Sequence, residues 1–164
     1  MFPLKPLSKE AIPAALAKAE KYLLVSEPWQ SESICRDVLA VDPGNQPALV
    51  ALVLALVMQF GQGISAKDAW DAVAQLTGEY ERAYYSGLIE ERRAIAVLRQ
   101  GDLRAGSVVH ALFRQAMDWY EKAAALRPPS NDDALLRWNA CVRVLRRNPQ
   151  IAPEHEDRAV VGLE

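Results

Sequence analysis

Residues 31–56 read SESICRDVLAVDPGNQPALVALVLAL, and this stretch contains the pattern that decides the fold. Before the break, apolar residues recur every three or four positions, the spacing of one face of an α-helix. Pro43 ends that helix, because the residue before a proline is pushed out of the helical region. Asn45 follows as an N-cap, which satisfies free N–H groups at the start of a helix. The stretch therefore predicts two helices joined by a tight turn.

The same pattern occurs again over residues 116–142, with Pro128 in place of Pro43 and Asn131 in place of Asn45. Glycine and proline breaks divide the remaining apolar stripes into further helices. Two copies of one pattern indicate a repeat architecture. We expect seven helices and no strand. The first helix begins at Ser8 or Ile12 and ends before Ser26, and the sixth begins at Asp102 or Ala105 and ends at Leu126. The others are expected over residues 28–41, 46–60, 65–77, 79–100 and 132–148.

The repeated pattern resembles the tetratricopeptide repeat (TPR) family, in its degenerate bacterial form. Residues 12–45 have the length of one such unit, about 34 residues. The small, aromatic and proline positions of the motif correspond to Ala19, Tyr22, Ser31, Val38 and Pro43. The resemblance implies an all-α fold, a right-handed stack of antiparallel helical hairpins with about three TPR-like repeats and a C-terminal capping helix. A single domain would span residues 1–148, followed by a polar tail over 149–164.

The resemblance also implies a binding groove, because in TPR proteins the first helix of each pair lines a concave surface that holds a peptide. Carried over by position, the lining combines apolar residues with arginines that suit an acidic group, since arginine pairs with carboxylates through two parallel hydrogen bonds. The implied peptide-binding residues are Leu54, Val57, Met58, Arg92, Arg99, Arg137, Asn139 and Arg143. The same carry-over extends this lining to further positions: Leu16, Glu20, Leu23, Leu24, Val50, Glu91, Ile95, Leu136 and Ala140.

These residues also have plainer interpretations. Residues 46–60 are apolar on nearly every side, as in a helix that is packed on several faces or lines an apolar groove. If the helix is core, the arginines are solvated or paired with Glu90, Glu91 or Asp133. A further alternative is structural self-assembly, in which a homodimer or larger oligomer buries the exposed apolar part of this helix. The sequence leaves these interpretations open.

Two residues carry more specific expectations. Glu91 falls on the apolar stripe of the fifth helix, and a buried carboxylate requires a partner. We expect a structural ion pair there, with a functional carboxylate as the alternative. Trp29 is expected on the buried side of the second helix, together with Val38 and Leu39.

Composition and charge argue against several classes of function. The chain has 51% hydrophobic residues and a net charge of −2, which is ordinary for a globular protein and suggests no nucleic-acid partner. Cys35 and Cys141 have no Cys or His at metal-ligand spacing, so we expect no metal and no cofactor. No local Ser/His/Asp or Cys/His pattern appears, and we expect a non-catalytic protein.

Location follows from similar observations. The apolar run over residues 48–58 is shorter than the roughly 20 residues that span a bilayer, so we expect no membrane insertion. The first residues contain no apolar signal segment. Two lone thiols fit a reducing compartment, and we expect a cytoplasmic protein. The expected function is an adaptor that binds a peptide or helix of a protein partner in a TPR groove.

Overall fold

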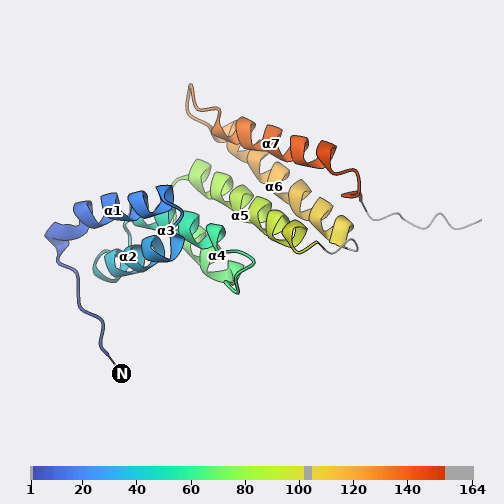
Figure 1. The fold of residues 1–164 in the computed structure, drawn as a ribbon. Coiled ribbons are helices and arrows are strands. Elements are labelled where there is room, and N and C mark those ends of the chain that lie inside the picture. The colour runs from blue at the N-terminus through green and yellow to red at the C-terminus, as the bar shows by residue number, and fades with distance from the viewer. Residues whose placement is uncertain (1, 102–104, 154–164) are drawn as a thin grey trace, which may run out of the picture.

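The computed structural model describes residues 2–101 and 105–153. Within these ranges the chain is all-α, with no strand, and consecutive helices pack mostly as antiparallel neighbours (Figure 1). A short 3₁₀ turn (Lys9–Ala11) leads into the first helix. The seven helices are α1 (Ile12–Leu24), α2 (Pro28–Val41), α3 (Gln46–Met58), α4 (Ala66–Ala74), α5 (Glu79–Arg99), α6 (Gly106–Leu126) and α7 (Asp133–Arg147).

Local signals account for most helix ends. Pro13, Pro28 and Pro47 lie in the first turns of α1, α2 and α3, where the missing N–H of proline costs nothing. The Asn45 side chain caps α3 by accepting a hydrogen bond from the Ala48 N–H at 3.0 Å. The helix boundaries predicted from the sequence are therefore close to those observed, with one clear exception in α4.

Helix α4 is shorter than the predicted 65–77, because it ends at Ala74. The Thr77 N–H and hydroxyl both donate to the Gln46 side-chain oxygen, at 2.9 and 3.2 Å. These bonds hold the chain after α4 against the start of α3, so it leaves the helical path. A tertiary contact thus overrides the local helical pattern.

The core consists of two main clusters. The first surrounds α3, where eight of the thirteen residues are buried, and it includes residues from α1, α2, α4 and α5. The second lies among α5, α6 and α7, around Phe113 and Tyr120. Helices two apart in sequence also pack, α1 on α3 and α3 on α5. Figure 1 shows α1–α4 at one end of the molecule and α6–α7 at the other, with α5 between them.

Gly87 allows α5 and α6 to approach closely. A Cβ atom at this position would lie 2.7 Å from a ring carbon of Tyr120, which is fully buried on α6. Any larger residue at position 87 would displace the Tyr120 ring. Glycine therefore sets the separation of these two helices.

Three segments differ from the compact helical body. Residues 2–8 form an extended arm whose outer part runs clear of the body in Figure 1, with Phe2 99% and Leu4 91% exposed. At the base of the arm, Leu7 is partly buried and lines a small hollow together with residues of α1 and α2. The loop between α3 and α4 is exposed, and Gly61 and Gly63 adopt positive φ values of 88° and 86°. At the other end, Ile151 is 6% exposed and packs in the second cluster, so the packed body continues beyond residue 148.

One packing expectation was wrong. Trp29 is 59% exposed, although the helical pattern placed it on the buried side of α2 with Val38 and Leu39. Trp29 precedes Ser31 by two positions, which places it about 200° around α2 from that residue. The core residues Ser31, Cys35 and Val38 share one face, so Trp29 lies on the opposite face. Among the residues that the structure describes, no helix is both long and apolar enough to cross a membrane.

Candidate functional site

A groove with a volume of about 470 Å³ lies between α1, α3 and the start of α5. Its apolar lining comes from Leu23 of α1, Val50 and Leu54 of α3, and Leu76 from the connection before α5. Glu20 and Glu81 are the charged residues in the lining. The groove therefore offers an apolar floor with carboxylates beside it, open to solvent.

One wall of the groove is held in place by hydrogen bonds. The Gln46 side chain accepts from Thr77 and also donates to the Gly44 carbonyl at 3.0 Å. Arg82 donates to the carbonyl oxygens of Leu76 and Thr77, at 2.8 and 3.0 Å. Because these hydrogen bonds are made within the chain, binding would require little ordering of this wall.

The structure separates the three apolar residues predicted for peptide binding. Leu54 lines the groove and is partly exposed. Val57 is only 4% exposed and belongs to the core around α3, so it faces the interior of the fold. Met58 is partly buried at the end of α3 and does not line the groove. Of the further positions that the TPR resemblance added, three line the groove, namely Glu20, Leu23 and Val50. The others do not line it: Leu16, Leu24, Glu91, Ile95, Leu136 and Ala140.

The predicted residue Arg137 is paired inside the molecule. Its Nη1 atom donates to Glu91 Oε1 at 3.1 Å, and its Nε atom makes a long contact of 3.5 Å with the Tyr84 hydroxyl. Glu91 is 5% exposed, and its second oxygen accepts from the Tyr120 hydroxyl at 2.6 Å. The ion pair expected for Glu91 is therefore present, and it joins α5, α6 and α7.

The surroundings of Tyr120 and Arg137 keep the hydroxyl and the guanidinium protonated, as their hydrogen bonds to Glu91 require. Burial and the Glu91 charge raise the pKa of Tyr120, so its hydroxyl stays protonated and can donate. Burial alone would lower the pKa of Arg137, but the Tyr84 bond and the Glu91 charge outweigh it and raise that pKa. The Arg137 charge is thus neutralised inside the fold, where an acidic peptide would have to displace Glu91.

The other predicted polar residues do not gather at the groove. Arg92 is partly buried, and its Nε atom has no hydrogen-bond partner among the described residues. Arg99, Asn139 and Arg143 are exposed on α5 and α7. None of the four lines the groove beside Leu54. The structure therefore does not join the predicted arginines to the apolar floor.

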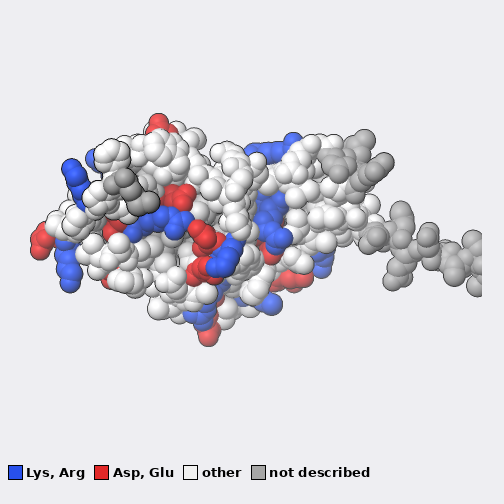
Figure 2. Space-filling model, turned by 90° about the horizontal axis from the view of Figure 1, so that it is seen from below, with Lys and Arg blue, Asp and Glu red and all other residues white. Residues whose placement is uncertain are grey.

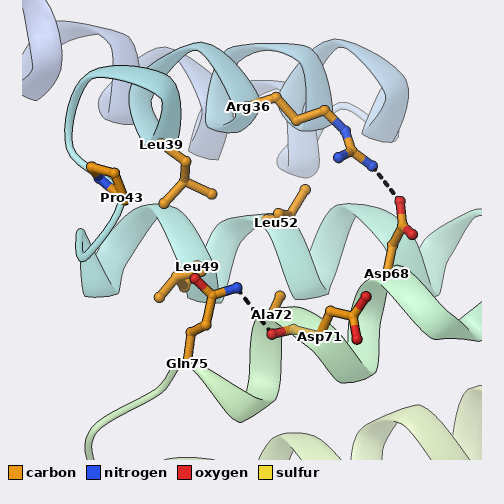
Figure 3. A pocket seen from close by; sticks show the side chains of 9 residues that line it. All are labelled: Arg36, Leu39, Pro43, Leu49, Leu52, Asp68, Asp71, Ala72 and Gln75. Atoms are coloured by element: carbon orange, nitrogen blue, oxygen red, sulfur yellow. Dashed lines mark hydrogen bonds and ion pairs between the residues drawn. The ribbon is translucent and has the colours of Figure 1, made fainter.

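Two hollows between successive hairpins were missed by sequence reasoning. The first, about 370 Å³, lies between α2, α3 and α4 over Leu39, Leu49 and Leu52. Figure 3 shows Arg36 of α2 and Asp68 of α4 joined across its edge, with an N–O distance of 2.7 Å. The hollow forms from three helices, so no single periodic stripe could reveal it.

The second hollow, about 630 Å³, lies between α4, α5 and α6 and is mainly apolar. Trp70 and Trp119 contribute to its wall, and the Lys122 ammonium lies 4.3 Å from the centre of the Trp119 ring. The two tryptophans were the available signal, but both had helical spacing typical of core residues. On the face drawn in Figure 2, basic and acidic side chains alternate over the middle of the molecule without forming one continuous basic patch.

The potential metal ligands and the two thiols are further reactive groups in the part of the chain that the structure describes. No group of three His, Cys, Asp or Glu side chains there could hold a metal ion. Both cysteines are free and buried, and burial raises the pKa of Cys35 to about 11 and that of Cys141 to about 12. At neutral pH the thiols are therefore protonated, and a protonated thiol is a poor nucleophile.

No family model matches this chain, and searches of curated proteins and of solved structures find no match either. The resemblance to TPR proteins therefore rests on the residues of the two repeated stretches.

Proposed function

We propose that this protein is a non-catalytic interaction adaptor that holds a peptide or helix of a partner in the groove between α1, α3 and α5. The observation that carries this proposal is an apolar floor beside a wall that is already hydrogen-bonded. Leu23 of α1 and Val50 and Leu54 of α3 remain partly exposed there, although eight of the thirteen residues of α3 are buried. Such preformed apolar grooves are typical of binding sites.

A TPR-like arrangement supports the same proposal. In this proposal, helices α1/α2, α3/α4 and α5/α6 are three hairpins of a right-handed stack, and α7 caps it. The packing of α1 on α3 and of α3 on α5 supports such a stack, because stacked hairpins contact their neighbours in this way. The groove would then lie on the surface that holds peptides in TPR proteins. The two free thiols fit a cytoplasmic location for such an adaptor.

Apolar side chains of the partner supply most of the affinity in this proposal. One buried Leu or Phe side chain contributes about 1.5–3 kcal/mol. Two or three such side chains, less the cost of ordering the peptide, correspond to dissociation constants in roughly the micromolar range or weaker. An acidic group on the partner finds no free arginine in the groove itself, because Arg137 is held by Glu91.

Self-assembly through α3 has less support. Eight residues of this helix are buried within their own chain, so the apolar surface expected for a dimer is mostly used. What remains exposed of α3 is largely the lining of the groove.

A randomised peptide library displayed on phage tests the proposed function even while the partner is unidentified. Peptides selected on the wild-type protein should bind Leu54→Asp at least tenfold more weakly, because a charge replaces an apolar contact in the floor. Leu23→Asp should act in the same way from α1. Circular dichroism checks that each variant keeps its helical content.

The matched control is Val108→Asp, which puts the same charge on an exposed valine of α6 outside the groove. This variant should bind the selected peptides like the wild type. A library that yields no binder, or binders that are indifferent to Leu54→Asp and Leu23→Asp, would contradict the proposed groove.

A further inference from the structure

The N-terminal arm, residues 2–8, exposes two large apolar side chains in an extended segment. Phe2 and Leu4 are almost fully exposed, and each leaves about 1.5–3 kcal/mol of possible burial unused. Pro3 and Pro6 restrict the backbone of the arm, and proline-bearing segments favour an extended conformation. Such a segment loses little further entropy when it binds in extended form.

The groove matches the arm in both polarity and charge. Its floor is apolar, and its charged lining residues, Glu20 and Glu81, make no ion pair with any described residue. Lys5 is the charged residue of the arm. The cation next to Glu81 in sequence, Arg82, is directed to two carbonyl oxygens instead. A lysine between the two carboxylates would therefore complement the groove.

The arm is too short to fill the groove of its own chain. Glu20 lies about 17 Å along α1 from the base of the arm, at about 1.5 Å of rise per residue. An extended arm rises about 3.1 Å per residue, so the Lys5 backbone reaches about 9 Å from that base and Phe2 about 19 Å. Within one chain, only the tip of the arm could touch the near edge of the groove.

We propose that the arm of one copy docks in the groove of a second copy, with Phe2 and Leu4 over Leu54 and with Lys5 between Glu20 and Glu81. The occupant is thus a second copy of this chain. This inference rests on the proposed function, because it uses the same groove. Two copies that exchange arms fill both grooves, which closes the assembly as a dimer. A partner peptide then competes with the arm for the groove.

Light scattering of the full-length protein over a range of concentrations tests the exchange. The wild type should shift from monomer towards dimer as its concentration rises. The double variant Phe2→Glu, Leu4→Glu should associate about 10,000-fold more weakly, since each of the two grooves loses two apolar contacts worth about tenfold each. Both residues lie outside the packed body, so these changes leave the fold intact.

Mixing variants distinguishes arm exchange from other modes of association. Leu54→Asp has an intact arm and a damaged groove, whereas the Phe2→Glu, Leu4→Glu variant has the reverse. Each should be monomeric alone, and their mixture should form a one-to-one complex. A wild type that stays monomeric at all concentrations would overturn the inference, as would a dimer that either variant leaves unchanged.

The charge match has its own measurement. Lys5→Glu should weaken association about three- to tenfold at low salt, as expected for contacts between exposed charges. The difference from the wild type should largely vanish at about 1 M salt, where the screening length is about 3 Å. A Lys5→Glu variant that associates as strongly as the wild type at low salt would contradict the assigned position of Lys5.

A synthetic peptide with the arm sequence FPLKPL separates failure of this inference from failure of the proposed function. It should bind the Phe2→Glu, Leu4→Glu protein, and Leu54→Asp in that protein should abolish binding. If selected library peptides bind the groove and the arm peptide does not, the arm inference is wrong and the adaptor function stands. If neither binds, both fail.

Discussion

The two parts of the molecule, α1–α4 and α5–α7, bury different kinds of side chain. Helices α1–α4 pack around α3 through apolar side chains, and no charged residue of these helices is buried. The buried charges of the described chain, Glu90 and Glu91, both lie on α5 in the other part. There, Glu91 is bonded to Tyr120 of α6 and Arg137 of α7.

The difference indicates different roles for the two parts. Apolar packing is non-directional, so α1–α4 can leave an apolar groove on their surface while remaining stable. A buried ion pair adds little net stability, but it is satisfied in one arrangement of its helices and costs several kcal/mol when a partner is lost. We infer that Glu91 sets the position of α7 on α5 and α6.

The largest loss in the free energy of unfolding is expected from a substitution in the core around α3. Leu56→Ala removes a fully buried side chain and should lower the free energy of unfolding by about 3–4 kcal/mol. Urea denaturation measures this change. Val108→Ala, at an exposed position of α6, should change it by less than about 0.5 kcal/mol. A small effect of Leu56→Ala would mean that α3 is not the centre of the fold.

A somewhat smaller effect is expected when the buried ion pair is broken. Arg137→Leu should lower the free energy of unfolding by about 2–3 kcal/mol, below the value for a fully buried pair. The reason for the discount is that the Arg137 side chain is 32% exposed, so water can reach Glu91 once it is gone.

The partner variant for this ion pair is Glu91→Gln, whose side-chain amide oxygen can still accept a hydrogen bond from the Tyr120 hydroxyl. The double variant Glu91→Gln, Arg137→Leu should recover about half of the loss, because no unpaired charge remains. Strictly additive losses in this double-mutant cycle would show that the two side chains do not interact.

Each part of the molecule contains one buried thiol, so the pH dependence of the free energy of unfolding compares the two parts. Burial raises the pKa of Cys35 from 9.0 to about 11, so the folded thiol keeps its proton where the unfolded one has lost it. The stabilising contribution is complete below pH 9 and is lost as the pH rises through 11, by about 3 kcal/mol. For Cys141 the loss should continue to about pH 12, since burial and then the Glu91 charge raise its pKa further.

The free energies of unfolding of Cys35→Ala and Cys141→Ala, measured between about pH 8 and 12, give the contribution of each thiol to the loss of stability. Each variant should lose stability less steeply with pH than the wild type. Equal slopes in all three proteins would show that neither thiol is as buried as its position in the core requires.

The smallest effect concerns the ion pair at the edge of the first hollow. Arg36 and Asp68 are both about half exposed, and Arg36→Gln should change the free energy of unfolding by less than about 0.5 kcal/mol. High salt should remove even this difference. A loss comparable with that of Arg137→Leu would erase the proposed distinction between exposed and buried pairs.

Sequence patterns predicted the helices well, because their ends depend on local chemistry such as the Pro43 break and the Asn45 cap. They failed where a distant residue decides the outcome. The end of α4 depends on bonds from Thr77 to Gln46, which lies 31 positions earlier. Trp29 was misplaced for another reason, because it lies on the face of α2 opposite Ser31, Cys35 and Val38 and the expected stripe combined two faces.

The candidate site was predicted only in part for the same reason. Leu54 could be placed from the repeat register, since its neighbours on α1 and α5 follow from the order of the hairpins. Val57 lies one turn further on α3, and the core cluster covers it there. Glu91 was expected to have a partner, but the pattern did not identify Arg137, 46 positions later. Pairings between helices require their relative placement, which only the fold supplies.

The exposed loop between α3 and α4 has a practical consequence for labelling this protein. Nothing lies within 4 Å of the position that a Cβ atom would occupy at Gly63, and loop tips of this kind tolerate inserted sequence well. The loop is separate from the groove lining and from the α5–α7 cluster. A short tag inserted there could carry a fluorophore that reports assembly and peptide capture without modifying the N-terminal arm.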